Sequence, residues 1–192
     1  MFKKLVLTLT LALTLFAALL APTQAQAFGL APDWDAVQEQ ATLIVQQAQA
    51  ATVAAQHIQA YAAQIQAQES DPAVQGLAAD LIALAAQTEQ DAAAVAATAE
   101  DINARIDNSE ATTLRLSDDI GAMADRIGEM ADRILWTEGQ IGLMADRIVE
   151  SEYLISDSSL ALAGMIQNEA DLIAGSATNI QASVALIQAL LP

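Results

Sequence analysis

The sequence predicts an all-α protein, an up-down bundle of about four long helices. Three observations carry this prediction. Alanine and glutamine, both good helix formers, are abundant throughout the chain. Beyond the N-terminal segment, proline occurs only at Pro32, Pro72 and Pro192, so long stretches contain no helix breaker. Apolar residues recur at alternating spacings of three and four, the heptad pattern of helices that pack against one another.

The N-terminal segment has the three parts of a secretory signal peptide. Two lysines precede an apolar run from Leu5 to Ala21, and Ala25-Gln26-Ala27 supplies a small-x-small cleavage site. The apolar run is shorter than a comfortable membrane span. We expect residues 1–27 to be removed and residues 28–192 to form one domain, exported to the periplasm or the cell exterior. An uncleaved membrane anchor is the alternative.

The first helix of that domain is expected over residues 33–69, with Asp33 as its N-cap. Its inner face is mostly alanine, which lets a partner helix approach closely. The residues of this seam are Val37, Ala41, Ile44, Ala48, Ala51, Ala55, Ile58, Ala62 and Ile65. Asp71 and Pro72 then have the residue types of an N-cap and a first helical position, and they predict a second helix over 72–107.

The second seam begins at Val74 and continues in phase as far as Ile155. One very long coiled-coil helix would explain this continuity, and so would antiparallel helices that share a phase. The seam turns polar at Ser109 and Thr113 and again at Ser151 and Ser158. A capping-box spacing and a serine cluster favour turns at 107–110 and 155–159. We therefore expect two further helices, over 109–154 and 158–190, and prefer the bundle to an extended coiled coil.

The third segment contains a repeated heptad, Ile-Gly-x-Met-Ala-Asp-Arg, at 120–126, 127–133 and 141–147. With Ile at position a, Met falls at d, Ala at e and Gly at b, so these four share one broad apolar face. Asp at f and Arg at g lie on the opposite side. The predicted helix-packing or interaction surface consists of Ile120, Gly121, Met123, Ile127, Gly128, Met130, Ile134, Ile141, Gly142, Met144 and Ile148.

Glycine inside a helix costs on the order of 1 kcal/mol relative to alanine, so the three glycines of the repeat weaken the helix unless something packs against them. Close packing within the molecule is the first interpretation of this Gly/Ala ridge. A docking groove for another copy or another protein is the second, and the flexible methionines favour it.

Charge and composition exclude several classes of function. Residues 28–192 retain all 24 acidic residues against five arginines, a formal charge of −19. Such a surface repels nucleic acid. The chain has no cysteine and only one histidine, His57, which falls opposite the first seam and is expected to be exposed. Asp118, Asp125, Asp132 and Asp146 share position f but are about 10 Å apart along the helix, too far for one cation.

We find no motif for catalysis, a metal or a cofactor in this sequence. We therefore expect an exported, non-enzymatic structural or interaction protein that acts through helix-helix association along its heptad seams, with itself or another protein. One alternative is a membrane-active helical protein, suggested by the apolar tail Val184–Leu191, although a membrane partner is disfavoured by the absence of a basic face. The other is an acidic binder of cations or of a basic partner.

Overall fold

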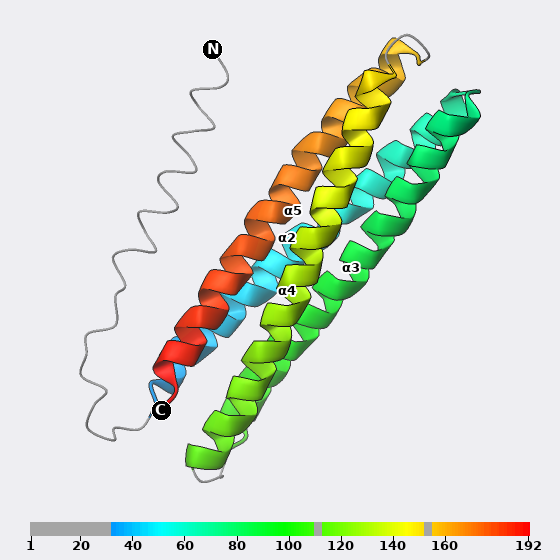
Figure 1. Cartoon of the computed structure of the whole chain (residues 1–192). Helices are drawn as coiled ribbons and strands as arrows, with labels where there is room; N and C mark the ends of the chain where they lie inside the picture. The colour runs from blue at the N-terminus through cyan, green and yellow to red at the C-terminus, as the bar shows by residue number, and fades with distance from the viewer. Residues whose placement is uncertain (1–31, 110–112, 152–154) are drawn as a thin grey trace.

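The computed structural model describes residues 32–109, 113–151 and 155–192 (Figure 1). Within these ranges the chain forms four long helices and no strand, which confirms the all-α bundle. The helices are α2 (Trp34–Gln68), α3 (Pro72–Asp107), α4 (Thr113–Glu150) and α5 (Asp157–Leu190). The predicted signal peptide, residues 1–27, lies outside the described residues, as does Glu110 of the proposed capping box.

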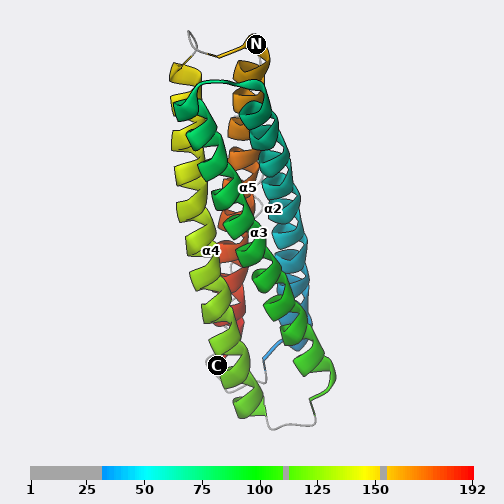
Figure 2. The ribbon, with the colours of Figure 1, turned by 90° about the vertical axis from the view of Figure 1, so that its right-hand side faces the viewer.

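The four helices run up and down and enclose one core. Each helix packs against the next along the chain, and α5 returns to pack against α2, so the contacts close a ring (Figures 1 and 2). The chain therefore folds back near residues 109 and 155 instead of continuing as a rod. The third helix begins at Thr113, a few residues later than the seam predicts.

The helix starts follow the capping residues of the sequence. The Asp33 side chain accepts a hydrogen bond from the Ala36 amide at 3.1 Å. Asp71 accepts one from the Ala73 amide at 2.8 Å and is followed by Pro72 in the first turn of α3. Ser156 caps α5. Side-chain caps satisfy amides that have no partner inside the helix, so these predictions are confirmed.

The predicted seams of α2 and α3 form the core. Every residue of the first seam is fully buried, and the second seam is buried from Val74 to Ile102. Isoleucine and alanine alternate along much of this interior, so bulky side chains from one helix fill the space left by small ones on its neighbours. The seam residues of α2 and α3 therefore pack against one another within one molecule.

Glu69 joins the ends of α2 and α5. Its backbone caps α2, and its carboxylate accepts hydrogen bonds from the Ser156 amide at 3.0 Å and the Ser156 hydroxyl at 2.7 Å. Hydrogen bonds from Ser159 and Ser156 lower the pKa of Glu69. A carboxylate at the N-terminus of α5 also interacts favourably with the helix dipole. Together with the hydrogen bond from Ser158 to Gln68, this side chain ties the end of α2 to the start of α5.

Candidate interaction surfaces

The isoleucines of the repeat lie in the core of the bundle. Each of Ile120, Ile127, Ile134, Ile141 and Ile148 is fully buried. They pack with residues of the neighbouring helices in one hydrophobic cluster. The helix-packing surface predicted from the repeat thus faces the interior, and an external partner could reach these isoleucines only if the bundle opened.

The alanines of the repeat are buried more deeply than its methionines. Ala124, Ala131 and Ala145 are fully buried, whereas Met130 and Met144 are only partly buried. The Met123 residue is 7% exposed. The buried face of α4 is therefore centred on positions a and e instead of a and d. Small residues at position e allow α5 to approach closely, so the buried face of α4 is directed toward α5.

Two of the three repeat glycines face α5. A Cβ added at Gly121 would lie 3.6 Å from Cδ1 of Leu191, and one at Gly128 would lie 3.7 Å from Cγ1 of Val184. A Cβ at Gly142 would meet nothing within 4 Å. Two of the three glycines therefore adjoin the α4–α5 contact, and Gly142 does not. These distances are ordinary van der Waals contact, so alanine would also fit.

The aspartates of the repeat receive hydrogen bonds from glutamines of α5. Gln188 donates to Asp125 at 2.7 Å, Gln181 donates to Asp132 at 2.5 Å, and Gln167 donates to Asp146 at 2.6 Å. The acidic row at position f is exposed, as predicted, and three of its four members, all but Asp118, are bonded to α5. We call this set of three bonds the Asp–Gln ladder.

The sequence contains a signal for this ladder. The three glutamines are spaced by multiples of seven, as are the three aspartates, and the two helices are antiparallel. In the one heptad without the repeat, Gly139 replaces the aspartate. The residue of α5 at the matching level is Ala174. Donor and acceptor are thus both missing from the same rung.

Arginines connect α3 to α4. Arg133 donates to Asp91 through Nη2 at 2.7 Å, and this hydrogen bond raises the pKa of Arg133. Nη1 of Arg105 lies 3.3 Å from Oδ2 of Asp119. Arg133 therefore finds its hydrogen-bonding partner on the neighbouring helix, and Glu129 of its own helix also acts electrostatically to raise its pKa.

His57 is exposed, as predicted, and lies beside α5. Its Nδ1 is 3.0 Å from Oε1 of Glu169, and its ring is tilted against Tyr61 with centroids 6.1 Å apart. No second histidine exists in the chain. Within the described residues, no three histidine, aspartate or glutamate side chains gather closely enough to hold a metal ion.

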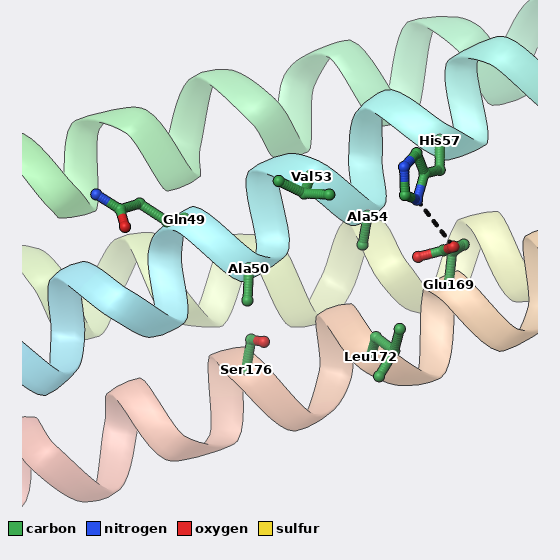
Figure 3. A pocket seen from close by; sticks show the side chains of 8 residues that line it. All are labelled: Gln49, Ala50, Val53, Ala54, His57, Glu169, Leu172 and Ser176. Carbon is green, nitrogen blue, oxygen red and sulfur yellow. Dashed lines mark hydrogen bonds and ion pairs between the residues drawn. The ribbon is translucent and has the colours of Figure 1, made fainter.

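A shallow apolar groove runs beside His57 between α2 and α5. Figure 3 shows Ala50 and Ala54 of α2 opposite Ser176 and Leu172 of α5, with Val53 at the rim. The groove has a volume of about 440 Å³. Val53 is 50% exposed and Leu172 is 61% exposed. Neither residue belongs to a predicted seam, and the sequence analysis did not single them out.

The outer surfaces of the bundle differ in charge. The helix α2 has no acidic residue, lysine or arginine between Glu39 and its end, and α5 has none after Asp171. All five arginines lie on α3 and α4, together with most of the acidic residues. We call the outer surface of α2 from Gln40 to Gln68, together with that of α5 from Leu172 to Leu190, the neutral face, and the outer surface of α3 and α4 the charged face.

The apolar tail of α5 contributes to the core. Val184 and Ile187 are buried, and Leu191 packs against the cluster. No helix among the described residues is long and apolar enough to cross a membrane. Comparisons of the chain with protein-family models, curated proteins and solved structures find no match.

Proposed function

We propose that this chain is an exported, non-enzymatic structural or protein-interaction protein, which acts by packing an outer face of its bundle against another protein. Because the heptad seams are occupied inside the molecule, such association must use side chains outside them. Interaction surfaces are depleted in charged residues and enriched in apolar ones at their centre. The neutral face, with Val53 and Leu172 exposed beside the groove, is the observation that supports this proposal.

Site-specific photocrosslinking tests the interaction role. A photoreactive residue replaces Leu172 in the full chain, expressed in the native host, and a second strain carries it at Trp136 on the charged face. Trp136 is 61% exposed, the same as Leu172, so the two positions are matched in accessibility. We expect a discrete protein adduct from position 172 and none from position 136. Absence of any adduct at position 172 would contradict the proposal.

Export rests on the composition of the N-terminal segment. We expect the protein recovered outside the cytoplasm to begin at Phe28, after the Ala25-Gln26-Ala27 site. N-terminal sequencing or intact mass measurement checks this directly. A protein that keeps Met1 and fractionates with the cytoplasm would refute export.

The charged face supports a second candidate function, capture of a basic protein. Its carboxylates outnumber its arginines, so an electrostatic attraction for cationic segments follows. Calorimetric titration with a lysine-rich peptide, repeated with calcium, separates the two cationic ligands. Binding of the peptide that weakens with salt would support this candidate, and the absence of heat with either ligand would remove it.

A further inference from the structure

Another cavity lies at the end of the bundle where α4 begins and α5 ends, close to the C-terminus marked in Figure 1. Its volume is about 430 Å³. Ser117, Asp118 and Asp125 of α4 and Gln188 of α5 line it, and the described residues around it include no lysine or arginine. Ser117 is only 5% exposed and is the most deeply buried of them, so it forms the floor of the cavity.

The hydroxyl of Ser117 is an unsatisfied polar group. Ser117 occupies position e, where the repeat has alanines that pack toward α5, such as Ala124. Its Oγ is buried and has no hydrogen-bond partner among the described residues. A buried hydroxyl without a partner destabilises the fold, and native proteins contain few of them. A ligand that donates a hydrogen bond to this oxygen would satisfy it.

Asp118 and Gln188 supply two further acceptors at the cavity. The next glutamine of the Asp–Gln ladder would follow Gln188 by seven residues, whereas α5 ends at Leu190. The Asp118 carboxylate therefore has no rung, and it forms no hydrogen bond or ion pair within the described part of the chain. Nε2 of Gln188 donates to Asp125 at 2.7 Å, which leaves its amide oxygen, Oε1, available as an acceptor.

We infer that this cavity binds a primary ammonium group, of the kind carried by a lysine side chain or by an aliphatic polyamine. An ammonium carries one positive charge and three N–H donors, and it has no acceptor. The cavity matches it with the Asp118 carboxylate, Oγ of Ser117 and Oε1 of Gln188. Leu191 lines the same cavity and offers apolar contact to the methylenes beside the ammonium. This inference rests on the second candidate function, capture of a basic ligand, and names the group that is bound.

Other small ligands fit the cavity less well. Asp118 and Asp125 are one heptad apart, about 10 Å along the helix, too far to bind one metal ion together. No three histidine, aspartate or glutamate side chains of the described residues are placed to hold a metal. An anion would be repelled by both carboxylates and by the formal charge of −17, and that charge attracts cations instead.

NMR titration of the isotope-labelled full chain, expressed with its own N-terminal segment, tests the inference with n-butylammonium. We expect saturable shifts at the side-chain amide of Gln188 and at the backbone amides of Ser117 and Asp118, with a dissociation constant on the order of 1 mM. Butyltrimethylammonium is the control ligand, because it carries the same charge and has no N–H donor. It should bind at least ~10-fold more weakly.

A pair of matched variants separates the site from general electrostatic attraction. Asp118→Asn should weaken n-butylammonium binding at least ~5-fold. Asp132→Asn removes the same charge from position f two heptads away, where the carboxylate is bonded to Gln181. It should change the dissociation constant less than ~2-fold. Equal losses in the two variants overturn the inference.

The Ser117→Ala variant gives a readout that a purely structural serine would not produce. Removal of the unsatisfied hydroxyl should raise the midpoint of thermal unfolding of the free protein. The same change should weaken n-butylammonium binding at least ~2-fold. A variant that loses stability and keeps its full affinity overturns the inference.

Two further ligands distinguish the sources of the ammonium. N-acetyl-lysine methylamide reproduces a lysine side chain within a protein, and putrescine is a free polyamine. Tighter binding of the first supports a protein ligand, and tighter binding of the second supports a polyamine. Absence of saturable shifts with n-butylammonium, or equal affinity for butyltrimethylammonium, overturns the inference. If the lysine-rich peptide still binds in a salt-dependent manner, capture of a basic ligand by the charged face stands and only this cavity is rejected.

Discussion

The neutral and charged faces enclose the same core but meet water in different ways. On the charged face, carboxylates and arginines form hydrogen bonds across the boundary between α3 and α4, as in the pair of Arg133 with Asp91. On the neutral face, side chains such as Val53 and Leu172 are exposed, and beside them Nδ1 of His57 lies 3.0 Å from Oε1 of Glu169. The first surface is adapted to solvent, whereas the second resembles the centre of an interface. Helices that share one core can therefore present outer surfaces with different roles.

The strongest contrast is between the core and either face. We expect Ile127→Asp to lower the free energy of unfolding by more than ~4 kcal/mol, because it places an unpaired charge among fully buried residues. Leu143→Asp on the same helix is the control. Leu143 is 58% exposed, so its replacement should cost less than about 1 kcal/mol. Urea denaturation measures both, and equal losses would contradict the assignment of the isoleucines to the core.

One carboxylate, that of Glu69, joins the end of α2 to the start of α5. Because the pKa of Glu69 is lowered in the folded protein, its contribution to stability is fully present above the pKa of the unfolded chain and is lost as pH falls through the folded pKa. Glu69→Gln should therefore reduce the midpoint of thermal unfolding at pH 7. The deficit should shrink as pH falls below about 4.

Thermal melts from pH 7 to pH 3 check this prediction. Glu100→Gln, on the exposed surface of α3, controls for the loss of one negative charge. A deficit that stays constant over this range would mean that Glu69 acts through packing and not through its ionised hydrogen bonds.

The missing rung of the Asp–Gln ladder lies where the two faces meet. We expect Gly139→Asp combined with Ala174→Gln to create a fourth bond, with a coupling free energy of about 0.5–1 kcal/mol. A Cβ at Gly139 has open space around it. A double-mutant cycle by urea denaturation isolates the coupling from the change in helix propensity. Zero coupling would show that the rungs at Asp125, Asp132 and Asp146 also contribute little.

Glu138 provides the smallest and opposite effect. It occupies position e, where the repeat has alanine, and burial together with the nearby Asp171 raises its pKa. The ionised form therefore opposes folding at neutral pH. Glu138→Gln should stabilise the protein by less than about 1 kcal/mol at pH 7, and the gain should vanish as pH falls through the folded pKa of the wild-type carboxyl. A loss of stability in chemical denaturation at pH 7 would disprove this account.

Local features of the sequence predict local features of the fold. Asp33, Asp71 and Ser156 identify the helix starts, because capping depends only on adjacent residues. The seams of α2 and α3 follow from periodicity alone. Periodicity does not predict which helices are neighbours, since a heptad specifies an inner face but not the helix that packs against it. The bonding of Asp125 to Gln188 and the tilt of α4 toward α5 depend on that order, so the sequence could not supply them without it.

The residues of the candidate surface can be found in the sequence only by looking for apolar residues off the seams. The heptad seams identify the residues of the interior and leave the outer surface undefined. Val53 and Leu172 are apolar residues off the seams, in helical stretches without charge. An off-seam apolar residue is ordinary when it stands alone. The structure brings these two together across the α2–α5 boundary, and this juxtaposition makes them a candidate site.

Small-angle X-ray scattering of the exported protein, measured as it elutes from a sizing column, tests the central claim most directly. A bundle whose longest helix has 38 residues is about 57 Å long. A closed bundle whose heptad seams pack inside one molecule should scatter with a maximum dimension close to this length. A particle longer than about 110 Å would contradict the claim, because it would mean that the seams extend into a long coiled coil.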